Sequence, residues 1–338
     1  MMRTRAIYGC LGPELTPDER RFFAEARPWG FIVFGRNIVD RDQLRALIAA
    51  LRECVEDENA AVLIDQEGGR VARLSPPHWR ERPSAARFGA LHEASQELAR
   101  EAAYLNARLM AKDLADLGIT VDCAPVLDLP LDGADAVIGD RAFGSDPAVV
   151  IDLGRVVLEG MLDGGVLPVM KHVPGHGRAT VDSHKVLPRV TVSLDELSAS
   201  DFVPFRSLNQ CPLAMTAHVV FDAIDPQRPA TTSPKVIRDV IRGEIGFEGA
   251  LISDDISMGA LKGPVSVRTK AALFAGCDLV LHCNGSMEEM KQVASEAMPL
   301  QDAWLKRCEA ALSHLNPPEP LDAEAGEARL AQLLEGAA

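Results

Sequence analysis

Short apolar runs alternate with longer amphipathic stretches along most of the chain. Eight of these runs are apolar on both faces, as parallel strands covered by helices must be, and they lie at residues 5–10, 30–34, 61–65, 120–126, 167–172, 213–218, 249–254 and 278–283. The stretches between them have helical patterns, at 16–27, 40–54 and 92–118 and beginning at 147, 233, 266 and 286. This alternation predicts an α/β fold, a (β/α)8 TIM barrel rather than a doubly wound open sheet.

The organisation of the chain favours a single domain. No low-complexity linker divides it before the Pro-rich segment at 316–320, and no GxGxxG follows the first strand, which argues against a dinucleotide-binding fold. We therefore predict one barrel domain over residues 1–338, with a helical C-terminal tail from about residue 301.

Composition and charge argue against a nucleic-acid-binding, an exported or a membrane protein. The chain has 35 basic and 49 acidic side chains and a formal net charge of −14, which repels nucleic acid. Its seven cysteines are scattered without a CxxC motif, as in reduced cytosolic proteins. The apolar run after Arg3 and Arg5 is too short for an export signal, and no segment approaches the ~20 apolar residues of a membrane helix. We expect a cytoplasmic monomer without nucleic-acid or membrane partners.

Polar residues follow the predicted strands where a barrel has its catalytic face. They are Asp65, Lys171, His172, His218, Asp254 and His282. The alternative is that a polar residue merely marks the end of a strand, and this alternative is strongest for the two histidines at 218 and 282.

The segment IDQEGGRVARL, residues 64–74, can orient a small polar substrate. Asp65 can accept hydrogen bonds from hydroxyl groups while Arg73 donates to a sugar oxygen or a carboxylate. The alternative is a salt-bridged turn in which Asp65 or Glu67 pairs with Arg70.

Two other loops carry candidate chemistry. The Asp- and Gly-rich loop at 128–147 does not have the acid spacing of an EF-hand, and a loop of this length in a barrel is usually functional. Arg141 is its best ligand contact, and a solvated surface arginine is the alternative. In LISDDISMGA, residues 251–260, successive side chains point to opposite faces, so one of Asp254 and Asp255 is expected to be functional while the other supports the next helix. A helix N-cap role for both remains the alternative.

The segment KHVPGHGRATVDSH, residues 171–184, holds three histidines. Asp182 and His184 lie two positions apart, so both can point the same way in an extended loop, where the carboxylate fixes the imidazole tautomer. The segment favours a proton-transfer pair above Lys171 and His172 as fixed ligand contacts. A metal site on His172, His184 and an Asp is the less favoured alternative, and we expect neither a metal nor a cofactor.

Four ordered motifs, IDQEGGRVARL, GDRAFGSDP, KHVPGHG followed by DSH, and SDDISM, resemble family 3 glycoside hydrolases over about residues 5–300. Within that family they are similar to the single-domain bacterial β-N-acetylglucosaminidases of peptidoglycan recycling. The resemblance implies that Asp254 is the nucleophile and that His184, paired with Asp182, is the acid/base. It also implies a set of residues that bind N-acetylglucosamine: Asp65, Arg73, Arg141, Lys171 and His172.

The implied activity is that of a retaining exo-enzyme in cell-wall degradation and carbohydrate metabolism. It would release terminal N-acetylglucosamine from small β-1,4-linked peptidoglycan fragments, N-acetylglucosaminyl-1,6-anhydro-N-acetylmuramic acid with or without peptide. Two alternatives concern the reaction, namely hydrolysis of chitooligosaccharides or other β-glycosides, and phosphorolysis. Two others concern the class of protein, namely a metal-dependent barrel hydrolase and a sugar-sensing binding protein. Departures from the family pattern are small and remove no reacting group. This chain has Val173 where the family commonly has Phe, Asp140 where Asn is common, Ser183 where Thr is common and Ile256 where Leu is common.

Overall fold

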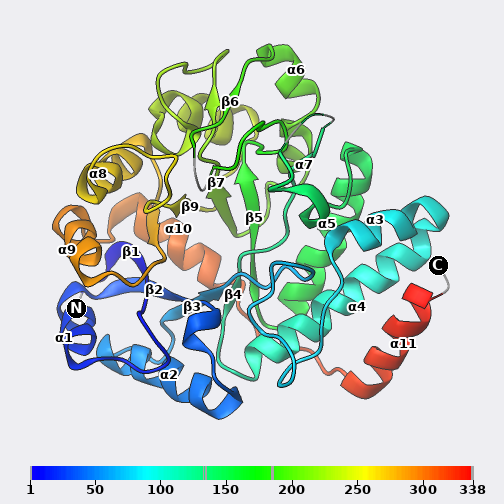
Figure 1. The fold of residues 1–338 in the computed structure, drawn as a ribbon, viewed down its shortest axis with the longest axis horizontal. Coiled ribbons are helices and arrows are strands. Elements are labelled where there is room, and N and C mark those ends of the chain that lie inside the picture. The colour runs from blue at the N-terminus through cyan, green and yellow to red at the C-terminus, as the bar shows by residue number, and fades with distance from the viewer. Residues whose placement is uncertain (1, 132, 134, 184–185, 336–338) are drawn as a thin grey trace.

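A closed ring of parallel strands forms the centre of the molecule (Figure 1). The computed structural model describes residues 2–131, 133, 135–183 and 186–335. Around the ring the strands follow chain order, and β10 closes it by pairing with β1. They are β1 Thr4–Gly9, β2 Pro28–Val33, β3 Ala61–Ile64, β4 Val121–Asp122, β5 Leu167–Val173, β7 Leu213–Thr216, β9 Ala250–Asp255 and β10 Leu279–His282. The predicted (β/α)8 barrel is confirmed.

Helices surround this ring (Figure 1). The α-helices are α1 Pro17–Ala26, α2 Arg41–Cys54, α3 Ala85–Ala94, α4 Gln96–Ala115, α5 Pro147–Asp163, α6 Leu194–Ala199, α7 Phe202–Ser207, α8 Val265–Ala275, α9 Met287–Glu296, α10 Asp302–Leu312 and α11 Ala323–Glu335. A π-helix, η4, spans Val236–Glu244, and short 3-10 turns are η1 Gly35–Asn37, η2 Gly139–Arg141 and η3 Ala230–Thr232. In the described part of the chain, no helix is long and apolar enough to cross a membrane.

The single helix predicted over residues 92–118 is wrong. The chain forms two helices that meet at Ser95, whose backbone is extended at φ −158° and ψ 111°. The Ser95 side chain accepts a hydrogen bond from the Leu98 amide and so caps the start of α4. A serine inside a continuous helical pattern thus marked a new N-terminus. The sequence analysis also missed the small parallel pair of β6 Arg189–Val190 and β8 Val220–Phe221 outside the barrel.

Barrel strands such as β3 supply two apolar layers, because successive side chains point to opposite faces. In β3, Ala61 and Leu63 pack inside the barrel, whereas Val62 and Ile64 face the helices. The barrel interior is therefore a packed core below the catalytic face.

Helices after residue 301 pack against the barrel and its outer layer. Side chains of α10, among them Cys308 and Ala311, belong to the apolar cluster inside the barrel. The Arg5 guanidinium from β1 lies 4.0 Å from the ring centroid of Trp304. Leu330 and Leu333 of α11 join the outer core, and α11 lies beside α4 (Figure 1).

We predict that Asp278→Ala destabilises the fold strongly. Asp278 is fully buried, and its carboxylate accepts hydrogen bonds from Arg242 Nη2 at 2.7 Å, Arg307 Nε at 2.8 Å and the Leu251 amide at 2.7 Å. Because truncation leaves two guanidinium groups without their carboxylate, the free energy of unfolding should fall by about 3 kcal/mol. Chemical denaturation followed by circular dichroism measures this loss.

The matched control is Glu101→Ala, which breaks the exposed ion pair between Glu101 and Arg329 on α11. An exposed pair contributes less than about 1 kcal/mol. Equal losses in the two variants would contradict the role given to the buried carboxylate.

Candidate active site

A cavity of about 370 Å³ opens at the carboxyl ends of the barrel strands. Six residues predicted from the sequence line it, namely Asp65, Arg73, Arg141, Lys171, His172 and Asp254. Asp182 is not among the residues that line it. His184, the predicted acid/base, lies outside the described residues.

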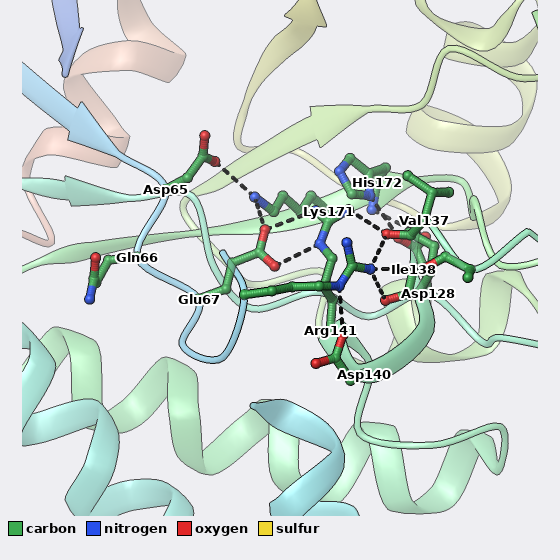
Figure 2. A network of polar contacts seen from close by, with 12 residues as sticks. Asp65, Gln66, Glu67, Asp128, Val137, Ile138, Asp140, Arg141, Lys171 and His172 are labelled. Atoms are coloured by element: carbon green, nitrogen blue, oxygen red, sulfur yellow. Dashed lines mark hydrogen bonds and ion pairs between the residues drawn. The ribbon is translucent and has the colours of Figure 1, made fainter. Parts of the chain in front are cut away.

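A buried ion network forms one wall of the cavity (Figure 2). The Lys171 ammonium lies between two carboxylates, 2.9 Å from Asp65 Oδ1 and 2.6 Å from Glu67 Oε1. Arg141 binds Glu67 in a bidentate manner, with both nitrogen–oxygen distances at 2.8 Å. Arg73 Nη2 donates to Asp65 Oδ2 at 3.2 Å. Strand β5 and the loops after β3 and β4 are thereby joined through charged side chains.

The network is ionised at neutral pH. Burial alone would lower the pKa of Lys171, but Asp65 and Glu67 outweigh it and raise that pKa. Burial alone would likewise raise the pKa of the two carboxyl groups, but Lys171 and the arginines outweigh it and lower both values. Three cations and two carboxylates therefore offer charged donors and acceptors to the hydroxyl groups of a sugar.

Gln66 and Asp122, which the sequence analysis did not identify, hold the loop after β3 in place. Gln66 Oε1 accepts hydrogen bonds from the amides of Arg73 and Leu74 at 2.8 and 2.9 Å, and the Gln66 amide donates to Asp122 Oδ1 at 2.9 Å. Its side chain points away from the ion network (Figure 2). Burial raises the pKa of Asp122 well above its usual value, although the bond from Gln66 opposes this. The loop that faces the cavity is thus preformed.

Arg70 joins two loops at the rim of the cavity. Its Nε donates to Asp140 Oδ1 at 2.7 Å, and its Nη2 donates to three carbonyl oxygens, those of residues 136–138. The alternative in which Arg70 pairs with Asp65 or Glu67 is therefore wrong. Glu67 instead belongs to the buried network, which the sequence analysis missed because its partners lie more than 70 positions away.

Asp128 fixes the ring of His172. The carboxylate is fully buried, and its Oδ2 lies 2.7 Å from His172 Nδ1. Such a pair favours a proton on Nδ1 and leaves Nε2 for a ligand. Burial would raise the pKa of Asp128, but His172 and His176 outweigh it and lower that pKa. The sequence analysis treated Asp128 only as the first acid of the Asp- and Gly-rich loop that was compared with an EF-hand, although it closely follows the fourth strand.

The two adjacent aspartates at the end of β9 differ in their surroundings. Both line the cavity, and Asp254 Oδ1 accepts a hydrogen bond from the Asp255 amide at 2.7 Å. The Asp255 carboxylate binds the Ser257 amide, the Ser257 hydroxyl and the Cys283 amide at 3.0, 2.7 and 3.2 Å. Asp255 therefore stabilises the turn after β9. A helix N-cap role for the pair is wrong, because α8 begins only at Val265.

His218 and His282 have structural partners. His218 lies 2.7 Å from Thr231 Oγ1 and 2.9 Å from the Asp255 carbonyl oxygen, one contact for each ring nitrogen. His282 Nε2 lies 3.0 Å from Glu289 Oε2. Neither ring lines the cavity. The structural interpretation holds for both.

Within the residues that the structure describes, no group of three or more His, Cys, Asp or Glu side chains is arranged to hold a metal ion. His172 belongs to the metal site that was considered as an alternative, and its Nδ1 contacts Asp128.

Comparison with known proteins places the chain in a family. The model for the glycosyl hydrolase family 3 N terminal domain matches residues 17–311. The chain belongs to glycosyl hydrolase family 3. A beta-hexosaminidase from Alkalilimnicola ehrlichii is 40% identical over 319 residues, covering 89% of this chain and 90% of the relative. The predicted enzyme class, a glycoside hydrolase of the β-hexosaminidase type, is confirmed.

Solved structures of family 3 enzymes have the same fold. NagZ from Neisseria gonorrhoeae in complex with N-trifluoroacetyl-D-glucosamine is 30% identical, with a TM-score of 0.87 and coverage of 100% of this chain and 99% of that one. A family 3 β-N-acetylglucosaminidase from Paenibacillus is also 30% identical, with a TM-score of 0.81. This chain covers 97% of its own length in that match but spans only 61% of the Paenibacillus chain.

We predict that acid destabilises the family 3 barrel partly through Asp128. A carboxyl group whose pKa is lowered on folding stabilises the fold fully above its unfolded pKa of about 4, and this contribution is lost as the pH falls through the folded value. Asp128→Asn removes the titrating group, so the variant should be less stable at neutral pH. Its stability should also fall less than that of the wild type between about pH 5 and pH 2.

Denaturant unfolding curves at several pH values measure how the free energy of unfolding of the wild type and of the variant changes with pH. Parallel losses of stability in the wild type and the Asp128→Asn variant would show that Asp128 is not held ionised by its neighbours.

Proposed function

We propose that this chain is a retaining exo-β-N-acetylglucosaminidase that acts on small peptidoglycan fragments in the cytoplasm. One observation carries the proposal: Asp254 lines the same cavity as the ion network of Asp65, Lys171, Glu67 and Arg141. A candidate nucleophile and a set of sugar-binding groups therefore face one space. The NagZ neighbour crystallised with N-trifluoroacetyl-D-glucosamine supports an N-acetylated sugar as the ligand.

The sugar-binding roles follow from the charges of the wall. Asp65 accepts hydrogen bonds from sugar hydroxyl groups, while Lys171 and Arg73 donate to the same ring positions. Arg141 donates to further sugar oxygens, and His172 Nε2, with the ring proton on Nδ1, accepts from a sugar hydroxyl group. These groups are held by one another before the substrate arrives, so little ordering is needed on binding.

In the first chemical step, the Asp254 carboxylate attacks the anomeric carbon and the glycosidic bond breaks. The leaving oxygen takes a proton from the His184 imidazolium, so a covalent glycosyl-enzyme and a free aglycone result. Asp182 orients the imidazole and stabilises its charge.

In the second step, neutral His184 removes a proton from water while the water oxygen bonds to the anomeric carbon. Asp254 leaves as a carboxylate, and two inversions give overall retention. Most retaining enzymes use two carboxyl groups about 5–5.5 Å apart. With histidine as the acid/base, that spacing does not apply here.

The substrate that fits the family resemblance is N-acetylglucosaminyl-1,6-anhydro-N-acetylmuramic acid, with or without its peptide, bound by a monomer. Chitooligosaccharides are the second candidate, since the cavity wall addresses only the sugar that is released. Because a neutral histidine repels an anionic acceptor less than a carboxylate does, phosphate is a further candidate acceptor in place of water.

We predict that the protein cleaves 4-nitrophenyl N-acetyl-β-glucosaminide far faster than the corresponding β-glucoside, and that EDTA does not change the rate. Asp254→Asn should lower kcat by at least about 10³-fold while the melting temperature stays close to that of the wild type. A slowly released fluorinated N-acetylglucosaminyl donor should add its mass to a peptide containing Asp254.

For each measurement, one outcome would contradict the proposal. Attachment of the label to Asp255, or full activity of Asp254→Asn, would refute the nucleophile assignment. Inactivation by EDTA with recovery on adding zinc would favour a metal-dependent hydrolase; a NagZ structure from Neisseria gonorrhoeae has been determined in complex with zinc ion. Faster cleavage of the glucoside would refute the substrate class.

A further inference from the structure

A side-chain contact bridges the loop after β5. His176 Nε2 lies 2.9 Å from Ser183 Oγ, across seven positions of the chain. Both side chains line the cavity, and both residues are only 3% exposed. A hydrogen bond shielded from water in this way is stronger than one on the surface.

The start of this loop is fixed to the barrel. The His176 amide donates to Asp128 Oδ1 at 2.6 Å, and the other oxygen of that carboxylate contacts His172 Nδ1. Gly177 packs so closely that an added Cβ would lie 1.9 Å from the Leu129 carbonyl oxygen. His176 is therefore held in place through its own backbone.

The His176 imidazole is neutral at physiological pH. Burial lowers its pKa to about 4, and the neighbouring His172 ring, with centroids 5.6 Å apart, acts in the same direction. The N–H of a neutral ring is too weakly acidic to protonate a leaving group at that pH, so His176 is a poor candidate for the acid itself. It can still bond a serine hydroxyl in either tautomer, because a hydroxyl both donates and accepts.

We propose that His176 is a positioning residue whose bond to Ser183 holds the proposed proton-transfer segment at the cavity. Ser183 stands between Asp182 and His184 in the sequence, so a contact that holds Ser183 lies directly beside both members of the proposed proton-transfer pair along the chain. Two contacts link Ser183 to the barrel: the Asp128 carboxylate holds the His176 amide, and the His176 ring contacts the Ser183 hydroxyl. This inference rests on the proposed function, because it assigns the contact a role in presenting the acid/base.

The competing explanation is that His176 only fills space below the loop. Proton donation matters most for poor leaving groups, because activated aryl groups depart with little protonation. Loss of a residue that positions the acid should therefore steepen the dependence of rate on leaving-group acidity. Loss of a residue that only packs should lower all rates alike, or lower stability without changing the dependence.

The experiment measures kcat/KM for aryl N-acetyl-β-glucosaminides ranging from dinitrophenyl to phenyl. Ser183→Ala and His176→Leu should each lower the phenyl rate by about 10- to 100-fold and the dinitrophenyl rate by much less. Ser183→Thr keeps the hydroxyl and should retain the wild-type slope. The double variant should be hardly worse than either single variant, because both remove the same contact.

His184→Ala, measured in the same series, separates this inference from the proposed function. If its losses do not follow leaving-group acidity, the acid/base assignment fails and the positioning role fails with it. If its losses do follow acidity but those of Ser183→Ala are uniform or absent, only the role of His176 is overturned. Should His176→Leu fail to fold, Ser183→Ala with its melting curve still decides between the two explanations.

Discussion

The buried ammonium of Lys171 is the interaction on which the rest of the site depends. Lys171 is 2% exposed at the end of β5, where an unpaired charge would be very costly. Asp65 and Glu67, both from the loop after β3, offset this cost, and Glu67 in turn holds Arg141 from the loop after β4 (Figure 2). One desolvated cation therefore fixes the relative positions of three consecutive segments of the barrel.

Supporting contacts make this arrangement rigid before any ligand arrives. Gln66 holds the two ends of its own loop together, Asp128 orients His172, and Arg70 ties the loop after β4 to the loop after β3. Charges preorganised in a site shielded from water stabilise a polar ligand without reorganising during the reaction. We propose that in this family 3 glycoside hydrolase the site binds one terminal sugar beside Asp254.

Sequence patterns were sufficient for the barrel because each strand is buried on both faces, and such runs can be recognised locally. The residues on the catalytic face followed from the same strand ends. The partners of Glu67, Arg70 and Asp128 could not be inferred in this way, since each pairing joins segments that only the closed ring brings together. Likewise, the helix break at Ser95 was missed because a serine that caps a helix cannot be told from a serine inside a helix by the sequence pattern alone.

The most direct test of the account is the activity of Lys171→Met compared with Lys112→Met, which removes an exposed lysine paired with Asp116 on the outer helix α4. If the buried ammonium organises the sugar-binding wall, Lys171→Met should lower kcat/KM for an aryl N-acetyl-β-glucosaminide by at least about 100-fold, or about 2.7 kcal/mol. Lys112→Met should be unchanged, and circular dichroism should show that both variants are folded. A folded Lys171→Met variant whose kcat/KM lies within twofold of the wild-type value would contradict the account.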